Sequence, residues 1–228
     1  MKSTLYIFSV LVFALLVGCK EENKTNPIEK YEVPAGVPAV HASIDGIKFN
    51  IANYPNQLNE WTIQTLSGTT ISAGKINGVF HTTNANRIER NGNNVLEARF
   101  NFHPPYLFLN DVSTEYTYER MVQHFKVGKQ AFQVFPQPLG SGFRLGVSYL
   151  DLNTVDLTIT PPTFSFETQI GSQEGSKCEI VKVTPLPNRG ILVTYEIDCK
   201  IYSITNVDYK RASRFVGTVQ VEYYHKQF

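Results

Sequence analysis

The fold is decided by the stretch Glu179-Ile180-Val181-Lys182-Val183-Thr184, Pro185-Leu186-Pro187-Asn188-Arg189-Gly190 and Ile191-Leu192-Val193-Thr194-Tyr195-Glu196-Ile197-Asp198. Two runs that are rich in β-branched residues flank a segment of proline, asparagine and glycine, which is the pattern of a β-hairpin. We expect the turn to be centred on Asn188-Arg189. This register places Cys178 opposite Cys199 and Ile180 opposite Ile197.

The same register sets Glu179 opposite Asp198, and two opposed carboxylates destabilise a strand pair. Either the expected pairing is out of place by one residue, or a neighbouring cation such as Lys177 or Lys200 compensates the two charges.

Further strand-like runs lie on both sides of this hairpin. Asp45-Gly46 is a hairpin turn signal between two short runs, and His103-Pro104-Pro105 ends another strand because proline cannot continue it. Alternation and turn residues predict strands at Trp61–Leu66, Leu96–Phe102, Phe143–Leu150, Val155–Thr160, Thr163–Thr168, Ile201–Val207 and Val216–Tyr224.

One segment has the period of a helix. Tyr118, Met121, Val122 and Phe125 follow the spacing of a single helical face. We expect a helix over residues 114–126, capped by Ser113 or Thr114, with its aromatic stripe packed in the core.

Many short strands with frequent turns predict a mainly antiparallel β-sandwich, or a barrel-like fold, with one short helix. Residues 20–36 are polar and contain Pro27 and Pro34, so residues 19–36 are expected to form a flexible linker. The β domain is expected to occupy residues 37–228, as one domain or as two small subdomains.

The chain starts with the pattern of a secretory signal. Lys2 precedes an uncharged apolar segment from Leu5 to Gly18, which is short for a membrane-spanning helix. Leu16-Val17-Gly18-Cys19 resembles a bacterial lipobox. The resemblance implies removal of residues 1–18 and a lipid on Cys19 that attaches the protein to a membrane. A plain signal peptide with an incidental Cys19 is the alternative.

Lys20-Glu21-Glu22-Asn23-Lys24 resembles the surface-export signal of lipoproteins from the Bacteroidota. This resemblance implies an outer-membrane protein exposed on the cell surface, with a periplasm-facing orientation as the alternative. Ser43 to Phe49, Trp61-Thr62-Ile63, Gly190 to Tyr195 and Ile204-Thr205-Asn206 are loosely similar to Bacteroidota lipoproteins with β-sandwich domains. That similarity implies architecture and location and no particular chemistry.

Cys178 and Cys199 remain once Cys19 is assigned to lipid. An even number of cysteines in an oxidising compartment, placed opposite each other in the hairpin, predicts a structural disulfide. A redox-active pair is less well supported, because no Cys-x-x-Cys motif is present.

The charge composition limits the class of binding partner that the sequence supports. Among charged residues, removal of residues 1–18 takes away Lys2 alone, which leaves 20 basic residues of the original 21 against 20 acidic ones. With neither excess charge nor a basic stripe, we do not expect nucleic acid as a partner.

Catalytic and metal-binding motifs are not evident. The sequence supports no metal site, because the five histidines lack ligand spacing, and a site assembled from distant residues is the alternative. These histidines are His41, His81, His103, His124 and His225. No cofactor is expected. Ser72-Ala73-Gly74-Lys75 matches a Ser-x-x-Lys motif without its companion motifs. Strand-borne acids are the remaining catalytic candidates, because glycosidases use two carboxylates across a cleft; these acids are Glu97, Glu167, Glu179, Glu196 and Glu222.

The expected function is therefore non-catalytic binding of a glycan or an envelope protein, or structural support of an envelope complex. A hydrolase of polysaccharide or peptide is the alternative. Trp61, Tyr54, Tyr106 and Tyr149 are candidates for a platform on which a sugar stacks, although each is also a normal core residue.

Overall fold

The computed structural model describes residues 31–52, 61–73, 75–91, 94–110, 114–151, 163–204 and 212–225. The side chains of residues 61–65, 86–91, 94–97, 149–151 and 163–164 are not among those described. All described residues belong to one unit, Tyr31–Phe228.

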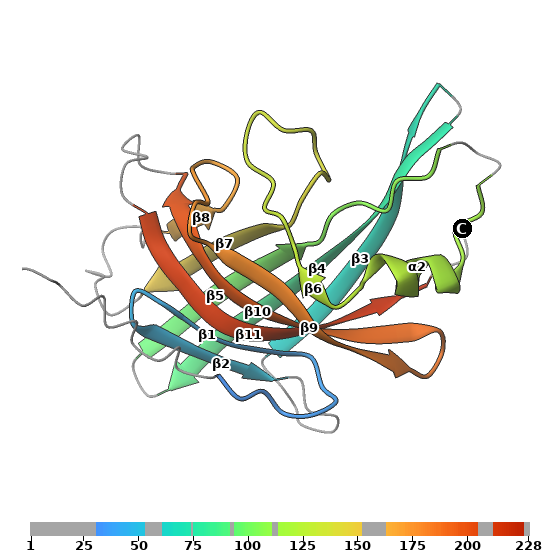
Figure 1. Ribbon diagram of the computed structural model, residues 1–228. Coiled ribbons are helices and arrows are strands. Elements are labelled where there is room, and N and C mark those ends of the chain that lie inside the picture. The colour runs from blue at the N-terminus through green and yellow to red at the C-terminus, as the bar shows by residue number, and fades with distance from the viewer. Residues whose placement is uncertain are drawn as a thin grey trace, which may run out of the picture. The chain divides into compact units, whose positions relative to one another are not determined.

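Over the described residues the unit is mainly antiparallel β structure with one short helix, which confirms the prediction from the sequence. Its strands are β1 (Ala39–Ile44), β2 (Ile47–Ala52), β3 (Trp61–Ser72), β4 (Lys75–Asn91), β5 (Asn94–His103), β6 (Gly128–Lys129), β7 (Arg144–Asp151), β8 (Thr163–Glu167), β9 (Lys177–Leu186), β10 (Gly190–Ser203) and β11 (Ala212–Tyr224); its helix is α2 (Tyr118–His124). Figure 1 shows these strands in a single curled sheet.

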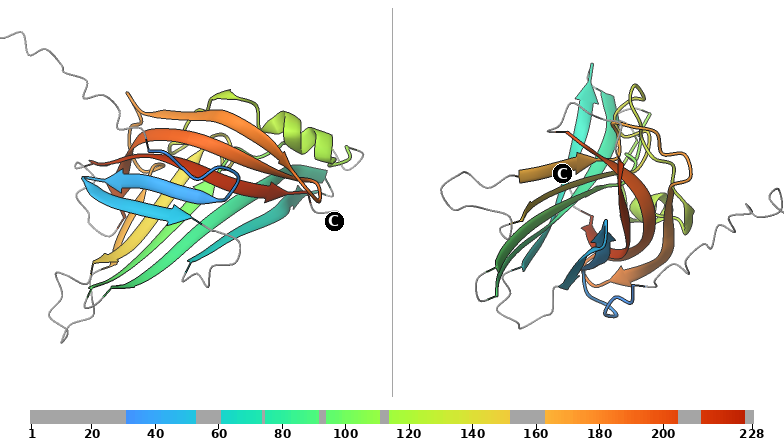
Figure 2. Two further views of the ribbon diagram at one scale, coloured as in Figure 1. Left: turned by 90° about the horizontal axis from the view of Figure 1, so that it is seen from below. Right: turned by 90° about the vertical axis from the view of Figure 1, so that its left-hand side faces the viewer.

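The order along the sheet is β2-β1-β11-β10-β8-β7-β5-β4-β3. One edge of β10 pairs with β9 from Gly190 to Asp198 and then with β8 at Tyr202 and Ser203. The sheet therefore forks at β10. Figure 2 shows it curling into a half-barrel, in which β3 and β4 approach β11.

The predicted hairpin between β9 and β10 is present, but its register differs from the expected one. Leu186 pairs with Gly190, so the loop has three residues, and Asn188 and Arg189 both have positive φ, 59° and 57°. A further shift between Thr194 and Tyr195 leaves Val181 as the extra residue of a β-bulge. Beyond the bulge the two shifts add up to two residues, so Cys178 and Ile180 keep their expected face. Between the turn and the bulge the shift is one residue, which places Val183 opposite Val193 and not opposite Thr194.

The prediction of a disulfide between Cys178 and Cys199 is wrong, because the structure does not contain this bond. Cys178 lies opposite Ile197 and Cys199 lies opposite Phe215, and both thiols are free and buried. Diagonal neighbours across strands are about 7–8 Å apart, which is beyond the roughly 7 Å that a disulfide spans between Cα atoms. Burial also raises the pKa of both thiols, so they stay protonated.

The expected Glu179–Asp198 opposition is wrong for the same reason. Asp198 pairs with Lys177 in the register and accepts two hydrogen bonds from Arg214, at 2.8 Å from Nε and 2.6 Å from Nη2. Glu179 lies opposite Glu196 on β10 and opposite Lys129 on β6.

The concave side of the sheet holds the core. Residues 191, 193, 195, 197, 199 and 201 of β10 alternate inward and are at most 2% exposed. Phe100 of β5 packs edge-on against Phe49 of β2, with ring centroids 5.2 Å apart, and against Phe215 of β11, at 6.2 Å. The inner face thus joins strands that are distant in the sheet order.

Helix α2 is shorter than predicted. It begins after Thr117, whose hydroxyl accepts a hydrogen bond from the backbone N–H of Arg120 at 3.2 Å, and not after Ser113 or Thr114. The expected apolar face is confirmed, because Met121 is buried in the core and Val122 packs against it. Phe125, just after the helix, stacks on Tyr223 of β11 at 4.4 Å.

Two other predictions concern strand limits. Ile201 to Ser203 continue β10 and do not start a separate strand, because no turn residue interrupts the run before them. The strand expected at Val155–Thr160 lies outside the described residues.

The Asp45-Gly46 turn is confirmed, with φ values of 47° and 89°.

A polar cluster lies beside α2 within the core. His81 of β4 is 2% exposed. Its Nδ1 lies 2.8 Å from the Ser67 hydroxyl and its Nε2 lies 3.0 Å from the Tyr116 hydroxyl. Burial, with smaller contributions from His124 and His225, lowers the pKa of His81 to about 3. His81 is therefore a neutral, fully hydrogen-bonded core residue.

The register predicts the chemistry of Cys178 and Cys199. In the folded protein we expect neither thiol to react with iodoacetamide, because both are buried. After unfolding without a reducing agent, both peptides should become alkylated, as mass spectrometry would show. Peptides that require prior reduction for alkylation would contradict the register of β9 and β10.

Candidate functional site

A row of residues on the outer face of the sheet forms the base of the candidate site. Asn101 of β5 lies opposite Gly146 of β7, and Gly146 lies opposite Glu167 of β8. His103 and Arg144 form the next pair along β5 and β7. Residues that are opposed in an antiparallel sheet share a face, so these side chains meet on one surface.

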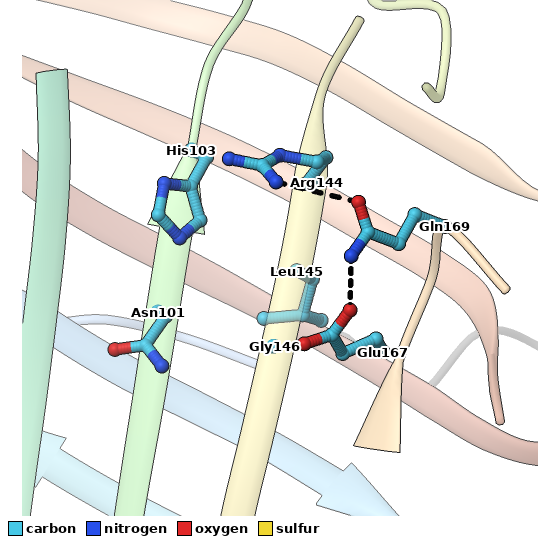
Figure 3. Close-up of a pocket in the computed structure, with 7 residues that line it drawn as sticks. All are labelled: Asn101, His103, Arg144, Leu145, Gly146, Glu167 and Gln169. Carbon is cyan, nitrogen blue, oxygen red and sulfur yellow. Dashed lines mark hydrogen bonds between the residues drawn. The ribbon is translucent and has the colours of Figure 1, made fainter. Parts of the chain in front are cut away.

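Gly146 creates a hollow in this surface. The hollow has a volume of about 50 Å³ and is lined by Asn101, His103, Arg144, Leu145, Gly146, Glu167 and Gln169 (Figure 3). A Cβ atom at Gly146 would lie 3.7 Å from Asn101, which is an ordinary contact. The backbone therefore tolerates a side chain at this position, and the hollow is open because glycine supplies none.

Gln169 connects the two charged residues of the hollow. Arg144 Nη1 donates a hydrogen bond to Gln169 Oε1 at 3.3 Å, and Gln169 Nε2 donates to Glu167 Oε2. Figure 3 shows this relay along one side of the hollow, with Asn101 and His103 across from it on β5. The relay fixes a cation and an anion at opposite ends of one amide.

His103 is neutral at physiological pH. Burial, with a smaller contribution from the nearby Arg144 cation, lowers its pKa to about 4. Its Nδ1 lies 2.9 Å from the Thr82 hydroxyl, which orients the ring. The hollow consequently carries one positive and one negative charge, with no net charge.

The site is equipped for hydrogen bonding. A guanidinium, a carboxylate, two amides and a neutral imidazole converge on a volume that holds a single small polar group of a larger ligand. Glu167 is the one carboxylate among the lining residues, whereas a glycosidase uses two. Within the described residues, no group of three or more His, Cys, Asp or Glu side chains is placed to hold a metal ion.

Among the candidate aromatic residues, Tyr106 is the one whose side chain the structure describes. Tyr106 lies on the outer face, 5.6 Å from Phe80 and 6.1 Å from Phe108 between ring centroids. Tyr149 pairs with Ala98, a core residue, and Trp61 pairs with Arg87 in the same register row. The side chains of Trp61 and Tyr149 are outside the described set, as are Tyr54 and Cys19 altogether.

The sequence analysis names two residues of the hollow as candidates, but it does not place them in the same site. His103 and Glu167 stood among the histidines and the strand-borne acids, 64 positions apart in the chain. Asn101, Arg144 and Gln169 carry no motif. The signal that links them is the strand register, which sequence pattern alone did not provide.

Comparisons with known proteins find no relative of this chain. No protein-family model matches the chain, and no match is found among curated proteins or solved structures. Within the described ranges, no helix has the length and apolar character that crossing a membrane requires.

The environment of His103 gives a measurable titration. We expect its imidazole to titrate near pH 4 in NMR spectra of the folded protein, well below the usual value of about 6.5. Arg144→Gln should raise this pKa, because a nearby cation disfavours the protonated ring, while burial should keep it below 6.5. A His103 midpoint that Arg144→Gln leaves unchanged would contradict the proximity of the two side chains.

Proposed function

We propose that this chain is a lipid-anchored protein of the bacterial outer membrane that binds a glycan or an envelope protein, without catalysing its conversion. Support for the location comes from the sequence, through the lipobox-like Leu16–Cys19 and the charged segment that follows it. Two or more acyl chains are sufficient for stable membrane attachment. The described unit, Tyr31–Phe228, would then face the aqueous phase at the cell surface.

The open hollow at Gly146 is the observation that carries the binding proposal. Its polar groups are held in place before any ligand arrives, by the Arg144–Gln169–Glu167 relay and by the Thr82–His103 hydrogen bond. Preorganised groups lower the entropic cost of binding. A hollow of this size suits one group of an extended ligand that otherwise lies along the sheet surface.

Binding is favoured over hydrolysis by the chemistry of the same hollow. Its single carboxylate, Glu167, is already a hydrogen-bond acceptor for Gln169. A second carboxylate for acid–base or nucleophilic catalysis is not among the lining residues. The groups present recognise hydroxyl and amide groups, which glycans and peptides both offer.

Filling the hollow tests the binding proposal. Gly146→Leu in the full-length, detergent-solubilised protein should lower affinity at least tenfold for any ligand found on a glycan array or by cross-linking to envelope proteins. Thr218→Leu places the same leucine side chain on the outer face of β11, away from the hollow, and should leave affinity unchanged. Unchanged binding by Gly146→Leu, with circular dichroism like that of the wild type, would refute the proposal.

The anchor is tested separately at Cys19. Cys19→Ala should abolish incorporation of radiolabelled palmitate and release the folded domain from the membrane fraction. Protease treatment of intact cells should degrade the wild-type protein if it faces outward. Continued palmitate labelling of Cys19→Ala would contradict the assignment of the lipid to this residue.

A further inference from the structure

Three aromatic rings lie on the outer face next to the hollow. Phe80 of β4 and Tyr106 are neighbours at 5.6 Å between ring centroids, and Tyr106 and Phe108 are neighbours at 6.1 Å. An isolated bridge between Val79 of β4 and Leu107 lies beyond the end of β5, so Phe80 and Tyr106 lie on neighbouring segments. Phe80, Tyr106 and Phe108 are called the aromatic platform below.

Glycines beneath the platform allow its rings to lie along the sheet. A Cβ at Gly68, the cross-strand neighbour of Phe80, would meet the Phe80 ring at 2.5 Å. A Cβ at Gly140 would meet the Tyr106 ring at 2.2 Å, and one at Gly78 would lie 3.5 Å from Phe108. The rings therefore cover the backbone of neighbouring segments, and Phe108 remains 55% exposed.

The platform is directly adjacent to the polar hollow. Thr82 is the next outward residue of β4 after Phe80, and its hydroxyl lies 2.9 Å from His103 Nδ1. Successive outward residues of a strand are about 6.6 Å apart, which is close to the width of one sugar ring. The two features are also joined at the backbone, since Tyr106 N–H donates to Gly140 O at 2.9 Å and Phe135 N–H donates to Gln169 O at 3.0 Å, at opposite ends of one loop.

The combination defines the ligand class. Aromatic faces accept the C–H surface of a pyranose ring, and the amides, imidazole and charged groups of the hollow pair with hydroxyls. Arg144 and Glu167 offset each other through Gln169, so the hollow offers no excess charge to an ionic ligand.

We infer that the outer face binds a neutral glycan chain, with one sugar ring stacked on Phe80, Tyr106 and Phe108 and the hydroxyls of a neighbouring unit in the hollow at Gly146. The inference rests on the proposed binding function and specifies its ligand. An envelope protein as ligand is the competing outcome.

Phe108 is the platform residue to change, because it is the most exposed. In isothermal titration of the full-length protein with neutral hexasaccharides of the malto-, cello-, xylo- and manno-series, at least one should bind. Phe108→Ala should weaken that binding about tenfold, consistent with the loss of an aromatic contact. Phe108→Leu keeps apolar bulk without a ring face and should also weaken binding. It replaces the alanine variant in this test if that variant is poorly folded.

Tyr224→Ala is the matched control. Tyr224 is 37% exposed and also covers a cross-strand glycine, since a Cβ at Gly190 would lie 2.6 Å from its ring. It does not line the hollow. Removal of the Tyr224 ring should leave glycan affinity unchanged. It should lower thermal stability, because the ring that covers Gly190 is lost.

The outcomes separate this inference from the proposed function. Neutral-glycan binding that is lost in both Gly146→Leu and Phe108→Ala supports both. Binding lost in Gly146→Leu but retained in the Phe108 variants overturns the platform alone. The anionic hexagalacturonate is titrated in parallel with the neutral series. Binding only of hexagalacturonate, or only of a protein ligand that Gly146→Leu blocks, overturns the neutral glycan and leaves the binding function standing. If Gly146→Leu leaves the affinity for every ligand unchanged, both the inference and the proposed function are overturned.

Discussion

The pairing of β10 is the constraint on which the rest of the structure depends. One edge of this strand is bonded to β11 from Gly190 to Tyr202, and the other edge is divided between β9 and β8. The sheet forks and curls, and the inward residues of β10, from Ile191 to Ile201, become the centre of the core.

The curl places chemistry on the convex side. The concave face is filled mainly by aliphatic and aromatic side chains, and the alternation of β5, β7 and β8 directs the polar residues of the hollow outward. There a glycine on β7 leaves room between Asn101 and Glu167, and hydrogen bonds hold the surrounding groups. The proposed binding surface is thus a consequence of the same alternation that builds the core.

The sequence predicted this architecture where its alternation is visible. β5, β7, β8 and β11 were located from apolar periodicity, and the helix face from its 3.6-residue spacing. β4 was missed because its inward positions include His81 and Thr83, which are buried and polar and so conceal the alternation. The hairpin register failed because neither a three-residue loop nor a bulge at Val181 has a distinct sequence signature.

The site was beyond prediction for a related reason. Its residues come from three strands and the segment after β8, and they adjoin only through pairings that are distant in sequence. The sequence offers Tyr106 as a stacking candidate by residue type alone, whereas the proposed platform depends on Phe80, Phe108 and the glycines beside them. A local pattern does not report such neighbours.

Cross-strand nuclear Overhauser effects provide the most direct test that register assembles this surface. Hα and amide protons of Gly146 should show contacts to Asn101 on one side and to Glu167 on the other, and Cys178 should show contacts to Ile197. A slip of one residue between β5, β7 and β8 would send these side chains to opposite faces. Contacts of Gly146 to Phe100 or Phe166 as its opposed residues would contradict the account.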